Sequence, residues 1–371
     1  MTGLRAQLQR FTTRPGARDY LSRRLRIDVR DGLWSVIVDV TRGCNLDCAM
    51  CWRGGGRPAR AGREVLSRLR TAVLPHALDI AFGCRHEALL HPDLPRFIAE
   101  LRTARDRRGG RAHLCLLTSG TLLDHSRSLA LARSGLDTIL FSVDSADPAC
   151  YAAVRRPARW PELAARLAEF VGLSAGRALH KAAQTVIMRS TLPHLALTFE
   201  TLAGLGLESF HFSQMVAAPQ RVRGEVLRLD ADRQAIVGAL ARLRLAARRR
   251  GTSVAVPAFA AALPAGEIFP VLGEGNVWDE DLLARERPAV CVAPWFKLRI
   301  DHEGWAFPCQ MMTHRGLAWG NIRERSFADI VNGSAAQRTR RELLAGRAPN
   351  RACRACPFGP LGAGPAGLRP G

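Results

Sequence analysis

The chain has 371 residues, of which 47% are hydrophobic. It is therefore long enough for a main domain of about 200 to 250 residues and a smaller one, and its composition excludes a disordered chain. The net charge of +21 is spread along the sequence and comes almost wholly from arginine, so nucleic acid is not the expected partner. No apolar run is long enough to cross a bilayer and the N-terminus lacks a secretory signal, so we expect a cytoplasmic protein without a membrane partner.

From residue 34 onward, short apolar segments alternate with longer amphipathic ones, which is typical of repeated βα units around a buried parallel sheet. The expected strands cover residues 34–40, 78–83, 112–118, 137–143, 183–188 and 210–216. A helix expected over 230–251, with apolar residues at helical spacing, completes the sixth unit. Six such units predict an α/β fold, a partial (β/α)6 TIM-like barrel whose reactive groups gather at the C-terminal ends of the strands.

The rhythm changes after the sixth unit. Residues 251–290 contain several prolines and glycines and are interpreted as a linker. A short hairpin and a helical region follow, which predict a small α+β domain over 291–358. Residues 1–33 are then an N-terminal extension, 34–250 form the barrel, and the Pro- and Gly-rich tail over 359–371 is expected to be disordered.

Three cysteines stand in a C-x3-C-x2-C arrangement directly after the first expected strand, at Cys44, Cys48 and Cys51. Three thiolates on one loop can bind three irons of a [4Fe-4S] cube and leave the fourth iron open to a substrate. The alternatives are a zinc site or three incidental thiols, although zinc normally takes a fourth ligand close by. The pattern therefore predicts an iron-sulfur cluster with one open iron.

This spacing, after a first strand, resembles the signature of the radical S-adenosylmethionine (SAM) superfamily. The resemblance implies that SAM chelates the open iron and is cleaved reductively to a 5′-deoxyadenosyl radical, which removes hydrogen from a substrate. The residue before the third cysteine is often aromatic in that family, whereas here it is Met50, whose apolar side chain can still pack against adenine.

Further positions at the strand ends are similar to the family's SAM-binding segments. By that resemblance, Glu87 accepts a hydrogen bond from the SAM amino group, although a glutamate here can also simply begin a helix. Ser119 takes the Asn position of a Thr-Asn-Gly turn, and Ser142 and Asp144 form a Ser-x-Asp segment that meets SAM, with Arg155 as a further contact. Each of these residues also has an alternative role in capping or turns.

A second set of four cysteines lies near the C-terminus, at Cys291, Cys309, Cys353 and Cys356. Four thiolates suit either a closed [4Fe-4S] cluster or structural zinc. The C-x17-C spacing, Gly304 five positions before Cys309 and the final C-x2-C resemble the SPASM/twitch extension of radical SAM enzymes. The resemblance implies one auxiliary [4Fe-4S] cluster, because four ligands are too few for two fully ligated clusters. Three further cysteines, Cys84, Cys115 and Cys150, belong to neither set.

The resemblance implies an oxidoreductase-type enzyme that receives electrons from a donor such as flavodoxin or ferredoxin. Gln214, at the end of the sixth strand, is the candidate catalytic residue and is expected to hydrogen-bond the substrate. The single auxiliary set is similar to that of aminocyclitol dehydrogenases, and only about thirty residues precede the first strand, so a sugar-like or other small metabolite is the expected substrate. A ribosomally made peptide is the alternative. A basic, zinc-stabilised nucleic-acid-binding protein is the alternative from another class.

Overall fold

The computed structural model describes residues 25–27, 34–51, 57–110, 112–215, 220–227, 229–256, 291–354 and 356. Most of the expected N-terminal extension and linker, and all of the expected tail, lie outside these residues. Within them, no helix is long and apolar enough to span a membrane. The chain forms two compact units: a first unit of Met1–Gly43, Gly56–Cys115 and Ala284–Gly371, and a second unit of Cys44–Gly55 and Leu116–Leu283.

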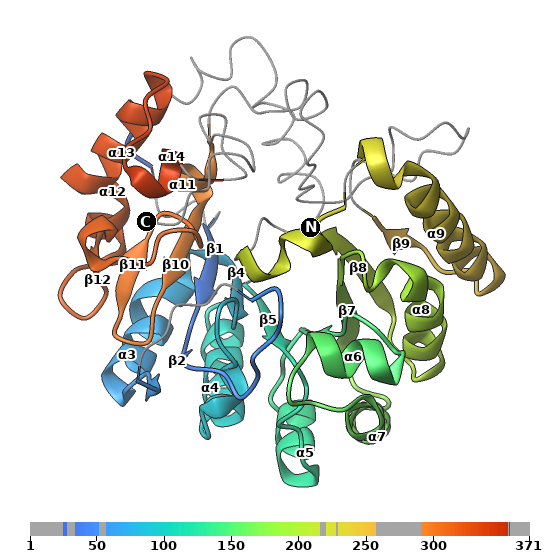
Figure 1. The fold of residues 1–371 in the computed structure, drawn as a ribbon. Helices are drawn as coiled ribbons and strands as arrows, with labels where there is room; N and C mark the ends of the chain where they lie inside the picture. Colours follow the sequence, from blue (N-terminus) through green and yellow to red (C-terminus); the bar gives the residue numbers. More distant parts are fainter. Residues whose placement is uncertain are drawn as a thin grey trace. The chain divides into compact units, whose positions relative to one another are not determined.

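The first unit contains a sheet in which strands from both ends of the chain are neighbours. Its strands are β1 (Trp34–Val38), β4 (Ala77–Phe82), β10 (Lys297–Ile300), β11 (Trp305–Phe307) and β12 (Gly320–Asn321), in the order β12-β11-β10-β1-β4. β1 pairs in parallel with β4 and with β10, so that Val38 stands opposite Ile300. β10, β11 and β12 pair antiparallel, as the orange strands beside β1 show in Figure 1. The C-terminal hairpin therefore extends the sheet that begins with β1.

The remaining elements of the first unit lie around this sheet. They are β2 (Thr41–Arg42), β3 (Ala59–Arg60), α3 (Arg63–Arg68), η2 (Leu69–Val73), η3 (Leu74–His76), η4 (Ala88–Leu90), α4 (Leu94–Arg107), α11 (Ala293–Phe296), η8 (Arg315–Leu317), α12 (Phe327–Asn332), α13 (Ser334–Leu344) and α14 (Arg351–Arg354). In α4, the buried Leu94, Phe97, Ile98 and Leu101 recur at three- and four-residue spacing and form one apolar stripe. Phe97 meets Phe82 of β4 edge-on at 6.1 Å between ring centroids, so this stripe holds the helix on the sheet.

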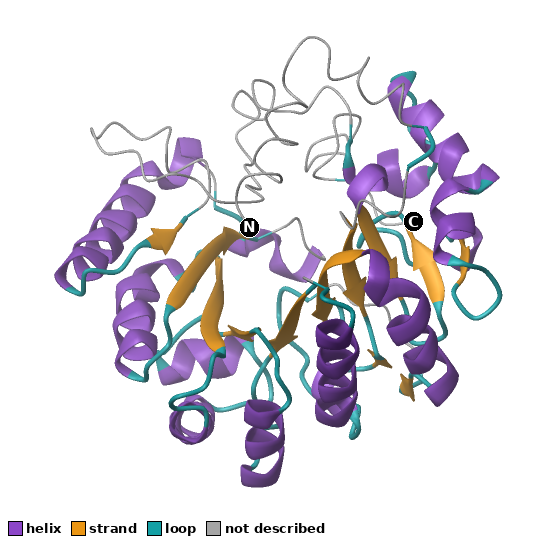
Figure 2. Cartoon of the chain, turned by 180° about the vertical axis from the view of Figure 1, so that it is seen from behind, coloured by secondary structure: helices purple, strands orange, loops and turns teal. Residues whose placement is uncertain are grey.

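The strands of the second unit pair in parallel. Helices lie outside them (Figure 2). The strands β6 (Thr138–Ser142), β7 (His180–Ile187), β8 (Ser209–Gln214) and β9 (Val254–Ala255) are neighbours in this order, and β5 (His113–Thr118) is shared between the two units. The helices are α5 (His125–Arg133), α6 (Pro148–Val154), α7 (Trp160–Leu173), η5 (Leu192–His194), α8 (Leu195–Gly204), η6 (Gln220–Glu225) and α9 (Leu229–Arg249). Edge-on ring pairs, Phe141 with Phe170 and Phe199 with Phe210, join strands to helices in the core.

All six strands expected from the sequence are present as β1, β4, β5, β6, β7 and β8, each within a few residues of its expected bounds. The helix expected over 230–251 is α9, and the expected C-terminal hairpin is β10 with β11. The predicted α/β class is therefore confirmed. Continuous apolar runs correctly predicted the buried strands, and helical periodicity correctly predicted the helix with one buried face.

Candidate functional site

The cysteine loop lies in the second unit, where backbone hydrogen bonds fix it against the end of α6. The N–H of Asp47 donates to the carbonyl of Arg156 at 2.7 Å, and the N–H of Ala49 donates to the carbonyl of Val154 at 2.8 Å. Cys48 lies between these two bonds and is buried. The middle cysteine of the motif is therefore held at a defined place beside residues 154–156.

None of the three thiols of this loop forms a disulfide bond, and Cys44 and Cys51 are both close enough to influence Cys48 electrostatically. Burial raises the pKa of Cys48 to about 11, Arg155 opposes this rise, and Asp144 and the other two cysteines add to it. The N–H of Leu46 faces the Cys44 Sγ at 3.4 Å. Among the residues that the structure describes, no three ligand-type side chains surround a common point. Three thiols with an N–H donor and a nearby cation fit an anionic, thiolate-bound cluster.

Two of the predicted SAM contacts, Asp144 and Arg155, meet each other beside Cys48. The Arg155 Nε donates to the Asp144 Oδ2 at 2.6 Å, and the Arg155 Nη1 lies 3.9 Å from the Cys48 Sγ. The other oxygen of Asp144 accepts the N–H of Val186 at 2.9 Å, and the Asp144 side chain is 0% exposed. The structure thus places Arg155 between the carboxylate and the thiol.

Ser119 is connected to the cysteine loop by a chain of side chains that the sequence analysis missed. The Ser119 hydroxyl lies 2.8 Å from the Thr121 hydroxyl, which accepts a hydrogen bond from the Asn45 Nδ2 at 2.9 Å. The Asn45 Oδ1 is buried and has no hydrogen-bond partner among the described residues. The available signal was the asparagine directly after the first cysteine, a residue that often hydrogen-bonds in loops.

The other predicted residues of the second unit are placed differently. Met50 packs against an apolar cluster that contains Val154 and Met215. Ser142 ends β6 and is half-buried. Gln214 ends β8, but its side chain lies outside the described part of the structure, so its predicted contact with substrate stays a prediction.

Glu87 lies in the first unit, where it begins the short helix η4. Its Oε1 accepts the N–H of Leu89 at 3.0 Å, and its backbone N–H donates to the carbonyl of Gly43 at 3.0 Å. The side chain is buried. The helix-start role weighed from the sequence is therefore present, and the contact with SAM stays a prediction.

The four C-terminal cysteines gather in the first unit although 65 residues separate Cys291 from Cys356 in the chain. Burial raises the pKa of Cys291 to about 12, and Cys309, Cys356 and Cys353 add to this rise. Backbone N–H groups of Ala293 and of Met311 point at the sulfurs of Cys291 and Cys309, respectively. Four neighbouring thiols with N–H donors fit a closed four-thiolate site for iron-sulfur or zinc.

Gly304 shapes the turn that leads to Cys309. Its φ is +89°, and a Cβ at this position would lie 2.7 Å from the Asn321 Oδ1, which accepts the N–H of Arg323. We expect Gly304→Ala to lower the free energy of unfolding by about 1 to 3 kcal/mol. The alanine would be held in a left-handed backbone conformation, and its Cβ would clash with the Asn321 side chain. Chemical denaturation measures this change. Gly172→Ala, in α7 with open space around it, is the matched control and should be neutral or stabilising; an equal effect of both substitutions would contradict the prediction.

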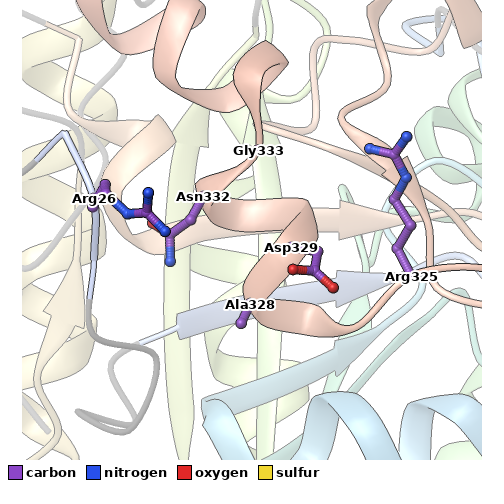
Figure 3. Close-up of a pocket in the computed structure, with 6 residues that line it drawn as sticks. All are labelled: Arg26, Arg325, Ala328, Asp329, Asn332 and Gly333. Carbon is purple, nitrogen blue, oxygen red and sulfur yellow. The ribbon is translucent and has the colours of Figure 1, made fainter.

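A pocket of about 410 Å³ lies in the first unit (Figure 3). It is lined by Arg26, Arg325, Ala328, Asp329, Asn332 and Gly333. The Asn332 amide donates to the carbonyl of Ile27 and accepts its N–H, both at 2.8 Å, so this pocket borders a segment held against α12. None of the predicted site residues lines it.

The structure therefore defines a protein of parallel βα units that carries two sets of cysteines suited to metal or cluster binding. The sequence matches the family model for the Radical SAM superfamily over residues 38–172 and the SPASM model, an iron-sulfur cluster-binding domain, over residues 291–357. The chain belongs to the radical SAM superfamily and carries a SPASM domain, which confirms the predicted membership. Enzymes of this family require SAM and a [4Fe-4S] cluster, and the SPASM domain binds auxiliary iron-sulfur clusters.

The chain is similar to several known proteins, and the length of the similar region differs between them. The PqqA peptide cyclase of Xanthomonas axonopodis pv. citri (strain 306) is 26% identical over 314 residues, which are 81% of this chain and 75% of that protein. The GTP 3′,8-cyclase of Corynebacterium glutamicum (strain R) is 30% identical over 125 residues, 32% of this chain and 33% of that protein. The structure of native anSMEcpe with bound AdoMet has a TM-score of 0.62 at 16% identity and covers 82% of this chain and 81% of that one. This last likeness confirms the predicted partial-barrel fold.

Proposed function

We propose that this radical SAM enzyme modifies a ribosomally made peptide. The support is the likeness to a PqqA peptide cyclase, which extends over 81% of this chain and 75% of that protein. The net charge of +21 would favour an acidic peptide segment. The sequence alone favoured a small metabolite, and the extent of this likeness is what moves the proposal to a peptide.

Within this proposal, Cys44, Cys48 and Cys51 hold the SAM-binding cluster, and the four C-terminal cysteines hold one auxiliary cluster. The observation that carries the assignment is a loop on which two thiols lie close to the Cys48 thiol, fixed by backbone hydrogen bonds beside residues 154–156. A [4Fe-4S] cluster held by these three cysteines would supply the electron for the reductive cleavage of SAM. The proposed SAM contacts are Met50, Glu87, Ser119, Ser142, Asp144 and Arg155.

The chain's own residues prepare this site by position and charge. The Leu46 N–H and the Arg155 guanidinium lie beside the thiols that must carry negative charge. Asn45 and Thr121 fix Ser119 relative to the loop, and the unpartnered Asn45 Oδ1 supplies an acceptor there. Gln214 at the end of β8 would bind the substrate, and flavodoxin or ferredoxin would supply the electron.

A small-molecule substrate is the second candidate. It is favoured by the likeness to a GTP 3′,8-cyclase over about a third of the chain, and by the single C-terminal set of four cysteines. On this alternative the auxiliary cluster would accept the electron left on a substrate radical, as an oxidoreductase requires.

Substrate-dependent formation of 5′-deoxyadenosine separates the two candidates. The anaerobically reconstituted enzyme, supplied with SAM and dithionite, is incubated with acidic precursor peptides or with aminocyclitols. We expect the amount of 5′-deoxyadenosine to increase when a peptide is added. Mass spectrometry should then show a decrease in the mass of that peptide that corresponds to lost hydrogen. A rise with an aminocyclitol alone would favour the small-molecule candidate, and intact SAM under reductant would contradict both.

A further inference from the structure

Arg155 is a buried cation that points at a thiol as well as at a carboxylate. Its guanidinium lies 2.6 Å from Asp144 and 3.9 Å from the Cys48 sulfur, and the residue is 8% exposed. The neighbouring Arg156 contrasts with it, because Arg156 faces Asp47 at 3.9 Å with both side chains more than half exposed. Water and salt screen the charge of Arg156, whereas the charge of Arg155 acts at short range on Cys48.

The position of this cation is fixed by its ion pair with Asp144 and by backbone hydrogen bonds of its two neighbours in the chain. Asp144 accepts from Arg155 with one oxygen and from the N–H of Val186 in β7 with the other. Two backbone hydrogen bonds, from Asp47 to Arg156 and from Ala49 to Val154, lie on either side of Cys48 in the loop. They also lie on either side of Arg155 in the segment that follows α6. The guanidinium therefore cannot leave the thiol without breaking a buried ion pair.

A fixed cation beside a thiolate ligand changes the energy of adding an electron. Reduction makes a thiolate-bound cluster more negative by one charge, and a buried positive charge stabilises the more negative form. Net charge and hydrogen bonds to the sulfurs are the general determinants of iron-sulfur potentials. Asp144, the buried negative charge that pairs with Arg155, must act in the opposite direction.

We propose that Arg155, positioned by Asp144, raises the reduction potential of the cluster at Cys48 and so eases the electron transfer that precedes SAM cleavage. This inference rests on the proposed assignment of Cys48 as a cluster ligand. It gives Asp144 a role through Arg155, as a positioning residue, and it is distinct from any contact of either residue with SAM.

The test is an anaerobic redox titration of the reconstituted full-length protein, followed by electron paramagnetic resonance. The signal that changes when SAM is added reports the cluster at the loop and separates it from the auxiliary cluster. In Arg155→Met, we expect the ratio of reduced to oxidised cluster at a fixed potential to fall at least about tenfold, which corresponds to about 59 mV for one electron. Arg155→Lys keeps the charge and should stay within about threefold of the parent.

Asp144→Asn should raise the same ratio, because it removes the opposing charge while the amide oxygen can still accept the hydrogen bond from the Arg155 Nε that positions the guanidinium. Opposite shifts in Arg155→Met and Asp144→Asn support the inference, since structural damage alone would not reverse sign. If Arg155→Met does not retain the cluster, the Asp144→Asn variant decides the question. The absence of a rise in its ratio of reduced to oxidised cluster would then overturn the inference. Arg156→Met is the matched control and should leave the potential unchanged. Iron-loaded parent protein without a SAM-responsive signal would overturn the proposed function itself, whereas unchanged potentials in variants that keep this signal would overturn the inference alone.

Discussion

Replacing Cys48 with Ala should abolish reductive SAM cleavage and remove one [4Fe-4S] cluster per chain. Two remaining thiolates, Cys44 and Cys51, are too few to hold a cube that needs three protein ligands and one open iron. Cys48 is also the buried member of the three, and its two neighbours in the chain, Asp47 and Ala49, hydrogen-bond to the backbone of Arg156 and Val154. Iron analysis, the visible absorption spectrum and 5′-deoxyadenosine formation under dithionite measure the loss.

Cys150→Ala is the matched control for this experiment. Cys150 is a half-buried thiol on α6, close in sequence to the same segment, and it belongs to neither cysteine set. We expect this variant to keep its iron and its SAM cleavage. Cleavage of SAM by Cys48→Ala at the parent rate would refute the assignment of the loop as the cluster site.

Local patterns were sufficient to predict most of the fold. The strand at Thr138–Ser142 has an uninterrupted apolar core, and α9 repeats apolar residues such as Ile236, Leu240 and Leu243 at helical spacing, so each element was visible in its own segment. The pairing of β10 with β1 was not visible, because about 260 residues separate the partners and neither segment carries a signal for the other. Parallel pairing between distant segments is decided by packing of the whole unit.

The features of the candidate site also divide into those that the sequence predicted and those that it did not. The cysteines were found because a metal cluster demands one residue type at close spacing. The contact of Arg155 with Cys48 was not found, because the loop and α6 are about a hundred residues apart and an arginine after a helix usually caps or faces solvent. The sequence suggested two roles for Glu87, a SAM contact and a helix start; the structure shows the second, because its side chain caps η4, and the first stays a prediction.

Breaking the buried ion pair between Asp39 and Arg299 should be among the most destabilising changes to the first unit. The Arg299 Nε donates to the Asp39 Oδ2 at 2.7 Å, with side chains 5% and 1% exposed, and joins β10 to the residue that follows β1. We expect Arg299→Met to lower the free energy of unfolding by about 3 to 5 kcal/mol, because the Asp39 carboxylate stays buried without its cation. Chemical denaturation measures this loss. The double variant Asp39→Asn/Arg299→Met should lose less than the sum of the two single variants, since neither charge then stays unpaired. Arg323→Ala, which breaks an exposed pair with Glu64 in the same unit, is the control and should barely move the midpoint; an equally small effect of Arg299→Met would show that the buried pair does not hold β10 against β1.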